Sequence, residues 1–236
     1  MLHVDNAAQA PEPDPTSLLA EAVRCAEERH WEVVPGTWLL DGDGAAVCCS
    51  CGDPGCALPG AHPVGEDWGL LASVGSAVVR EWWTERPEAS ILLPTGRAFD
   101  VLDVPEVAGC LALARMERMG MLLGPVLSAP AAQGRRGRRL HFLVLPGAVA
   151  KLPELLRQIG CVPGMLDLVA RGEGDWAVAP PSRFGGHATA LWARPPTLLN
   201  RWLPDAEEVF GPLAYACRRD PSAPRLVQRE TAAAAH

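Results

Sequence analysis

A short run of cysteine, glycine and proline is the feature that most limits how this chain can fold. Residues 48–63 read CCSCGDPGCALPGAHP and place Cys49, Cys51, Cys56 and His62 at the spacing C-x-C-x4-C-x5-H. The glycines and prolines disfavour regular structure, and the segment has almost no apolar residues from which to build a core. Thiolates and imidazole are the ligands that zinc prefers, and four of them form a closed structural site whose binding energy stabilises the fold. We therefore predict a structural zinc ion in this loop.

Two alternatives to this ligand set stay open from the sequence. Cys48 is adjacent to Cys49 and can take its place, and the segment can also be a thiol-rich surface loop with a chance histidine. The first residues, MLHVDNAAQAPEPDPT, show no signal peptide, so a cytoplasmic location is expected. In that compartment the eight cysteines are expected to be thiols or metal ligands rather than disulfides. No apolar run reaches the ~18 residues of a membrane span, so no membrane partner is expected.

The composition is that of a globular protein. Hydrophobic residues make up 48% of the 236 residues and charged residues 21%, which excludes a wholly disordered chain. The formal net charge of -7 argues against a protein that holds nucleic acid by charge alone. A local basic patch can still act, because electrostatic fields are screened within about 8–10 Å. The sequence GRRGRR supplies one candidate patch, formed by Arg135, Arg136, Arg138 and Arg139.

Helical and strand patterns mix without a strict βαβ rhythm, which favours an α+β fold. Helices are predicted within 17–31, 76–89, 107–121, 149–160 and 197–203, and strands within 32–40, 90–96, 98–104 and 138–146. The segments 165–170 and 175–181 are predicted to form a strand pair joined by the turn RGEG. The expected organisation is a disordered tail (1–15), one domain (16–205) and a C-terminal segment (206–236) that is largely disordered from about 220.

Acidic residues and a histidine fall on or beside the predicted strands. Asp100 and Asp103 lie in AFDVLDV, His141 lies in RRLHFLV and Asp167 lies in MLDLVA. Carboxylates on neighbouring strands can share Mg²⁺ or Mn²⁺, as phosphoryl transfer requires, and arginines beside a histidine match phosphate oxygens. The simpler interpretation is that the aspartates face solvent or cap turns and that the arginines form a charged loop.

The order of these motifs resembles the N-terminal domain of bifunctional DNA primase/polymerases, the Prim-Pol domain, a branch of the archaeo-eukaryotic primases. The resemblance runs from about Ser17 to Pro196 through the cysteine loop with PGxHP, then WW-x3-P-x-A, PTG, VLDV, a strand with histidine, and LDL…G…VAPPS. It implies an RRM-like catalytic core in which acids bind two divalent metals. These metals would activate a primer 3′-hydroxyl for in-line attack on the α-phosphate of a nucleotide.

The resemblance also implies roles for individual residues. Asp103 matches the first metal-binding acid, Asp167 the third acid, and His141 the contact to the nucleotide phosphates. Ser182, in the segment Ala179–Ser182, falls beside that site. The implied cofactors are structural Zn²⁺ on the cysteine loop and Mg²⁺ or Mn²⁺ on the acids. The implied partners are a single-stranded DNA template, nucleotides, and a replication helicase or another replication protein.

Three positions depart from the family's pattern. Pro105 stands where the family has its second metal acid, and proline has no carboxylate. Ala61 stands where the family usually has the lysine of PGKHP, so a positive charge is absent. Arg138 and Arg139 replace the glycine pair that usually precedes the histidine. Both arginines are expected to contact phosphates through their charge, although their bulk crowds the approach of a phosphate to the backbone.

Two nearby acids are candidates to replace the one missing at Pro105. Asp100 is three residues before Asp103, so a strand places the two on opposite faces and Asp100 is a poor substitute. Glu106 comes three residues after Asp103, and only a kink at Pro105 can bring it to the site.

Three hypotheses follow. The chain is a primase/polymerase whose nucleotidyl transfer is impaired by Pro105, or a catalytically inactive relative that binds nucleotide or nucleic acid or serves as a scaffold. The third is a zinc-stabilised α+β domain of unrelated function. In the first two, Asp103, His141 and Asp167 must converge.

Overall fold

The computed structural model describes residues 15–40, 48–131, 137–185, 188–197 and 202–220. The predicted terminal tails, Arg135 and Arg136, and most of the predicted helix 197–203 lie outside the described residues. Pro15 is the exception in the N-terminal tail, because the first helix begins there. None of the helices within the described ranges is both long enough and apolar enough to cross a membrane.

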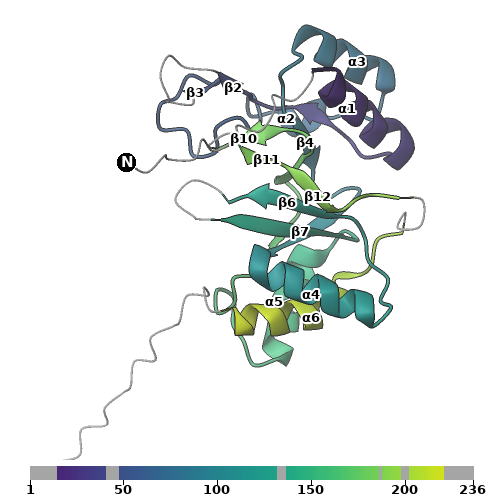
Figure 1. The fold of residues 1–236 in the computed structure, drawn as a ribbon, viewed down its shortest axis with the longest axis vertical. Coiled ribbons are helices and arrows are strands. Elements are labelled where there is room, and N and C mark those ends of the chain that lie inside the picture. The colour runs from purple at the N-terminus through teal and green to yellow at the C-terminus, as the bar shows by residue number, and fades with distance from the viewer. Residues whose placement is uncertain (1–14, 41–47, 132–136, 186–187, 198–201, 221–236) are drawn as a thin grey trace, which may run out of the picture.

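The predicted α+β class is confirmed, and the chain is arranged around a five-stranded antiparallel sheet (Figure 1). The strand order is β12-β6-β7-β5-β8. The strands are β5 (Asp100–Pro105), β6 (Val126–Pro130), β7 (Arg138–Val144), β8 (Val169–Arg171) and β12 (Leu191–Arg194). Within this sheet the chain runs through β5, α4 (Glu106–Arg118), β6, β7, α5 (Ala148–Gln158) and β8, so each helix connects two strands and returns to the same face.

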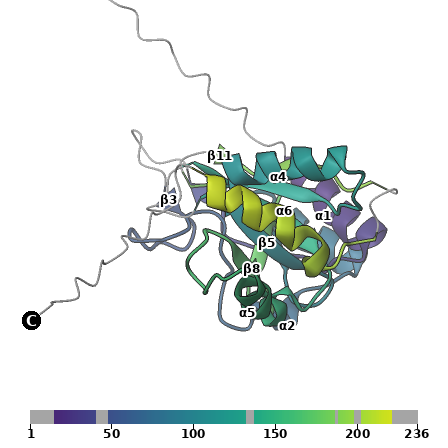
Figure 2. The ribbon, with the colours of Figure 1, turned by 90° about the horizontal axis from the view of Figure 1, so that it is seen from below.

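Three helices cover one face of this sheet, and Figure 2 views that layer from below. They are α4 (Glu106–Arg118), α5 (Ala148–Gln158) and α6 (Ala206–Arg219). Leu102 and Val104 of β5 and Phe142 of β7 point into this core, as the period of two along a strand requires. The alternate residues of the same strands therefore point to the opposite face, where the candidate site lies.

A second layer covers that opposite face. It consists of α1 (Pro15–Arg29), α3 (Ser76–Glu85) and a three-stranded antiparallel sheet with the order β1-β4-β9. The strands are β1 (Val34–Pro35), β4 (Ile91–Pro94) and β9 (Trp176–Ala179). Val101, Leu127 and Leu143 of the large sheet share a buried cluster with α1 and α3, so the two layers have one continuous interior. The smaller elements are β2 (Leu39–Leu40), β3 (Cys48–Cys49), α2 (Trp68–Leu71), β10 (Arg183–Phe184) and β11 (Ala188–Thr189).

The C-terminal segment was predicted to follow the domain 16–205 as a separate segment. Residues 206–219 instead form α6, which is part of the core. Val209, Phe210, Leu213 and Cys217 are buried against α4, α5 and the sheet. Asp205 caps the helix by accepting a hydrogen bond from the amide of Glu207 at 2.9 Å. Glycine and proline in the middle of the helical sequence, AEEVFGPLAYACRR, disfavour a helix, and tertiary burial outweighs that preference.

The predicted strand pair 165–170 and 175–181 is wrong. β8 pairs with β5 in the large sheet, whereas β9 pairs with β4 in the small sheet. The turn between them is held at the meeting point of the two sheets, where Thr95 donates hydrogen bonds to Asp175 and Gly172. Gly96 has a φ of +93°, and a Cβ atom there would lie 2.3 Å from the amide nitrogen of Glu173. Only glycine permits this close approach of the two loops.

Candidate functional site

The register of the large sheet places the predicted site residues on one face. Asp103 on the central strand β5 lies directly opposite His141 on β7, and Pro105 lies opposite Arg139. On the other side of β5, Arg171 of β8 lies opposite Val101. Directly opposed residues share a face, and so do residues two apart on a strand. The polar side chains are therefore brought together between the two layers.

Arg139 lies at the centre of this group and joins two of the predicted metal acids. Its Nε donates to Oδ1 of Asp103 in a short hydrogen bond, and its Nη2 also reaches the Asp103 carbonyl at 3.3 Å. Its two terminal nitrogens make a bidentate pair with Asp167, at 3.0 and 2.9 Å. Asp103 and Asp167 thus converge as expected, but the guanidinium of Arg139 lies between them.

The second oxygen of Asp103 is held by Arg171 and His141. Nη2 and Nε of Arg171 donate to Oδ2 at 2.7 and 3.0 Å, and His141 Nε2 lies 3.5 Å from the same oxygen. Arg171 Nη1 also contacts both carboxylate oxygens of Asp175, at 3.3 and 3.2 Å. Two arginines and three aspartates therefore form one ion-pair network.

Burial and neighbouring charges set the protonation states. Burial acts to raise the pKa of Asp103, but attraction to His141, Arg139 and Arg171 outweighs it and holds that pKa below its ordinary value. Burial lowers the pKa of His141, and the arginines lower it further against the pull of Asp103. His141 is therefore neutral at pH 7, and a proton on Nε2 suits its contact with Asp103. Its Nδ1 is buried without a hydrogen-bond partner among the described residues.

These residues do not fit a pair of divalent metal ions. Metal binding requires carboxylate oxygens with free lone pairs, whereas both oxygens of Asp103 and both oxygens of Asp167 contact guanidinium groups. Pro105 adds no ligand and lies directly across from Arg139. A cation placed between the two acids would also meet the positive charge of Arg139, which is only 6% exposed.

A cavity of about 200 Å³ opens beside the network. His141, Arg139, Arg171 and Asp175 form its polar wall. The remaining wall is mostly apolar and contains Trp176, Val178 and Phe184. The positive charges that face the cavity are those already paired with aspartates.

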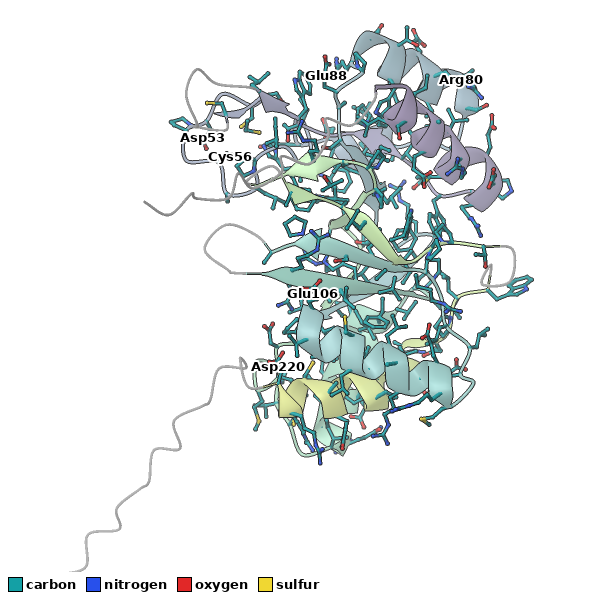
Figure 3. All side chains as sticks on the ribbon, in the orientation of Figure 1. Asp53, Cys56, Arg80, Glu88, Glu106 and Asp220 are labelled. Carbon is teal, nitrogen blue, oxygen red and sulfur yellow. The ribbon has the colours of Figure 1, made fainter. Side chains whose placement is uncertain are left out.

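Other predicted site residues lie away from this cavity. Glu106 is the first residue of α4 (Figure 3) and lies 3.8 Å from Arg138, so it pairs with an arginine outside the network around Asp103. Arg138 donates to Ser128 and to the carbonyl of Thr189. Ser182 is buried, and its hydroxyl accepts a hydrogen bond from the amide of Ile91 at 2.8 Å. The phosphate-binding roles of Arg138 and Ser182 stay predictions.

Asp100 faces the helices, as its spacing from Asp103 predicts. Its carboxylate accepts hydrogen bonds from the amides of Gly147 and Ala148, at 2.9 and 2.8 Å. These amides begin α5, so Asp100 stabilises the start of that helix and does not supply the missing acid.

In the sequence, Arg171 falls in the predicted turn RGEG and Asp175 in the predicted strand 175–181, so neither was predicted as a site residue. Arg171 reaches Asp103 only through the pairing of β8 with β5, and no local sequence signal shows that pairing.

The cysteine loop forms the predicted cluster. The ligand atoms of Cys49, Cys51, Cys56 and His62 all lie within 4.8 Å of one another, which suits a tetrahedral zinc site. The cluster includes Cys49 and does not include Cys48, which favours Cys49 as the ligand. Cys49 Sγ lies 3.4 Å from His62 Nε2 and accepts a hydrogen bond from the amide of Gly60. Burial opposes the thiolate, but amides of Cys51 and Gly60 favour it and bring the pKa of Cys49 to about 6.

Backbone contacts orient the histidine for metal binding. His62 Nδ1 lies 2.9 Å from the carbonyl of Pro63, so a proton on Nδ1 leaves Nε2 free as a ligand. Thr37 fixes the same residue through hydrogen bonds with its backbone amide and carbonyl. Gly60 has a φ of +76°, and a Cβ atom there would lie 2.9 Å from the carbonyl of Arg183, so glycine is required.

The loop also supports the cavity beside His141. Trp176 donates its indole N–H to the carbonyl of Ala61 at 2.8 Å, and Leu58 lines the cavity. Ala61 is fully buried beside Val34 and Phe184. The position that the resemblance matches to the lysine of PGKHP is therefore part of an apolar core in this chain.

The depressed pKa values predict that acid destabilises the fold. A group whose pKa is lower in the folded than in the unfolded state binds its proton more weakly when folded, so stability falls as the pH drops. Protonation of His141 should lower the free energy of unfolding below about pH 6.5, and protonation of Asp103 should lower it further below about pH 4. Urea unfolding in excess Zn²⁺ between roughly pH 5 and 8 should show the first loss, and His141→Asn should remove it. The exposed His30→Asn is the control, and equal pH dependence of both variants would contradict the account.

One comparison with known proteins agrees with the resemblance seen in the sequence. The family model described as bifunctional DNA primase/polymerase, N-terminal, matches residues 22–202, which is most of the chain. The chain belongs to this family. No curated protein and no solved structure matches it. The Prim-Pol match covers both the cysteine loop and the ion-pair network, so the unrelated-domain hypothesis is wrong.

Proposed function

We propose that this chain is a Prim-Pol domain in which an ion-pair network has replaced the two-metal centre, and that it acts as a binding or scaffold module. The observation that carries the proposal is the guanidinium of Arg139, which bridges Asp103 and Asp167. The segment β5-α4-β6-β7-α5-β8, with the sheet order β6-β7-β5-β8, supports an RRM-like core. Structural zinc on the cysteine loop is part of the same proposal.

Nucleotidyl transfer, the activity that the family implies, would require several of these contacts to break. Asp103 would have to release Arg139, the cation that also holds Asp167, before the two acids could share a metal ion. A triphosphate would compete with Asp167 and Asp175 for the same arginines. Breaking the contact between Asp103 and Arg139 costs free energy, because both residues are buried and have already lost their hydration. Binding of DNA template or nucleotide, and of a replication helicase, stays a prediction for this domain.

Primer extension tests the proposal. Zinc-loaded wild type and Asp103→Ala should both fail to incorporate nucleotides on primed or unprimed single-stranded DNA, with Mg²⁺ or Mn²⁺. Pro105→Asp alone should also fail, because the new carboxylate would face Arg139 directly. Pro105→Asp combined with Arg139→Gly restores the acid and removes the bridging cation, and it should gain activity.

Extension by the wild type that Asp103→Ala abolishes would contradict the proposal and establish an active polymerase. In that case the wild-type network must open when the substrate binds. Circular dichroism of all four proteins is the control for folding.

A further inference from the structure

An exposed apolar surface lies on α2 and the start of α3, which contain none of the residues of the ion-pair network. Leu70 and Leu71 of α2, with Val74 and Val78 at the start of α3, are 80%, 61%, 45% and 41% exposed. These four residues are called the α2 surface below. Four large apolar side chains exposed within nine residues make this segment a candidate site of association.

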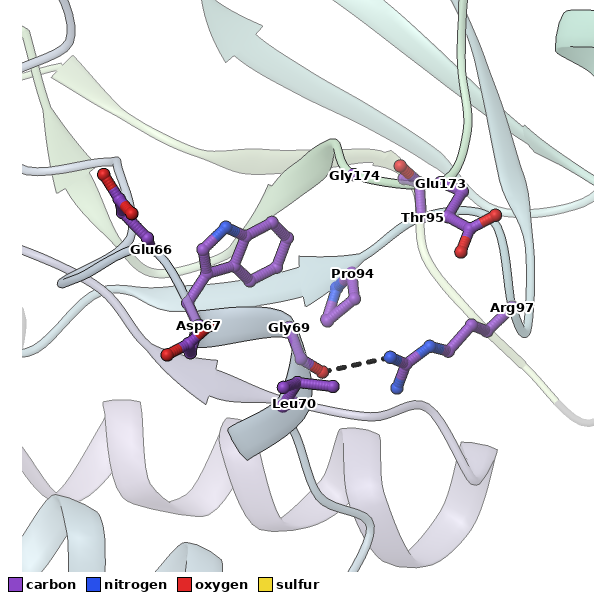
Figure 4. Close-up of a pocket in the computed structure, with 10 residues that line it drawn as sticks. Glu66, Asp67, Gly69, Leu70, Pro94, Thr95, Arg97, Glu173 and Gly174 are labelled. Carbon is purple, nitrogen blue, oxygen red and sulfur yellow. Dashed lines mark hydrogen bonds between the residues drawn. The ribbon is translucent and has the colours of Figure 1, made fainter.

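A pocket of about 240 Å³ adjoins the α2 surface, and several of the residues that line it are acidic (Figure 4). Glu66, Asp67 and Glu173 contribute carboxylates to its lining. The pocket also contains Arg97, but that guanidinium is already bonded to Glu32 at 2.7 Å and to the carbonyl of Gly69 at 3.1 Å. The lining is therefore negative overall, and it lies directly against Leu70.

An aromatic wall completes the pocket. Trp68 lines it and packs edge-on against Trp176, with ring centroids 5.5 Å apart. A tryptophan beside carboxylates offers a cation both a π face and negative charge. Arginine and lysine side chains combine such a cation with an apolar stem, which can cover neighbouring leucines.

We infer that the α2 surface and its acidic pocket dock a basic, amphipathic segment of a partner protein. Its apolar side chains would cover Leu70 and Leu71, and one arginine or lysine would enter the pocket between Glu66 and Glu173. Nucleic acid is disfavoured, because its phosphates would meet three carboxylates. A second copy of this chain is disfavoured by the net charge of -7 that each copy carries.

Peptide binding tests this inference. The probe is a short helical peptide of leucine, alanine and arginine, and its matched control has citrulline in place of each arginine. We expect the arginine peptide to shift the Trp68 indole N–H signal saturably in NMR spectra, and the citrulline peptide to bind about tenfold more weakly or worse. Leu70→Ser and Glu173→Gln should each weaken binding of the arginine peptide by about tenfold.

Matched variants away from the surface are the controls. Leu122→Ser also replaces an exposed leucine, and Glu88→Gln also removes an exposed carboxylate (Figure 3); both should bind like the wild type. Equal losses in these controls, or equal binding of the two peptides, would overturn the inference.

Two further outcomes would show that the α2 surface binds something other than a basic peptide, and either would overturn the inference. One is a Trp68 shift caused by oligothymidylate but not by the arginine peptide. The other is self-association that Leu70→Ser abolishes in sedimentation experiments. None of these outcomes depends on polymerase activity, so failure here and failure of the proposed function are distinguishable.

Discussion

Replacing Arg139 by methionine should lower the free energy of unfolding by about 3–5 kcal/mol, because removing it takes a cation away from the buried carboxylate of Asp103. Asp103 is 1% exposed, so water cannot take over its lost contact, whereas the Asp167 side chain is 24% exposed and can be hydrated in part. Arg171 still holds one oxygen of Asp103, which places the expected loss toward the lower end of this range. Urea unfolding at pH 7 in the presence of Zn²⁺ measures the change.

Second-site variants separate lost charge from lost packing. Asp167→Asn in the Arg139→Met background should recover part of the stability, because it removes one of the stranded charges. Arg157→Met is the matched control, since its ion pair with Glu154 is mostly exposed and should contribute little. An Arg139→Met protein as stable as the wild type would show that the network is not held as described.

Removing zinc should lower the stability of the fold by as much as the Arg139→Met substitution or more. The loop 48–63 has few apolar contacts of its own, and the cluster of Cys49, Cys51, Cys56 and His62 provides its main cross-link. Loss of a structural zinc site costs several kcal/mol, so we expect chelation to lower the melting temperature by roughly 10 °C or more. The fluorescence of Trp176 should change as well, because its indole is bonded to Ala61 in the loop.

Cysteine variants identify the ligands. Cys51→Ser should reduce the zinc content measured by atomic emission and reproduce the lower melting temperature. Cys48→Ser and the exposed Cys110→Ser should keep a full zinc content. Zinc loss in Cys48→Ser, with zinc retained in Cys49→Ser, would contradict the assigned ligand set.

Local patterns in the sequence predicted the parts of this structure that depend on local chemistry. The spacing C-x-C-x4-C-x5-H predicted the metal cluster because four soft ligands in a short loop have few other uses. The spacing of three between Asp100 and Asp103 predicted their opposite faces, since a strand repeats every two residues. Ligand spacing was enough for the first conclusion, and strand alternation was enough for the second.

The rest depends on pairing between distant segments. Nothing local shows that β8 joins β5 while β9 joins β4, and Arg171 reaches Asp103 only through that pairing. The same holds for α6, whose Gly211 and Pro212 disfavour a helix until burial of Phe210 and Leu213 stabilises it. The bridging role of Arg139 likewise emerges only when β7 is placed beside β5.

Binding of Mn²⁺ to the zinc-loaded protein, followed by electron paramagnetic resonance, tests the central claim most directly. If Arg139 occupies the place of the metals, wild type and Asp103→Asn should show the same weak binding to surface carboxylates. The combined Pro105→Asp and Arg139→Gly variant should bind Mn²⁺ more tightly, and Asp103→Asn should abolish that gain. Mn²⁺ binding by the wild type that Asp103→Asn removes would contradict the account.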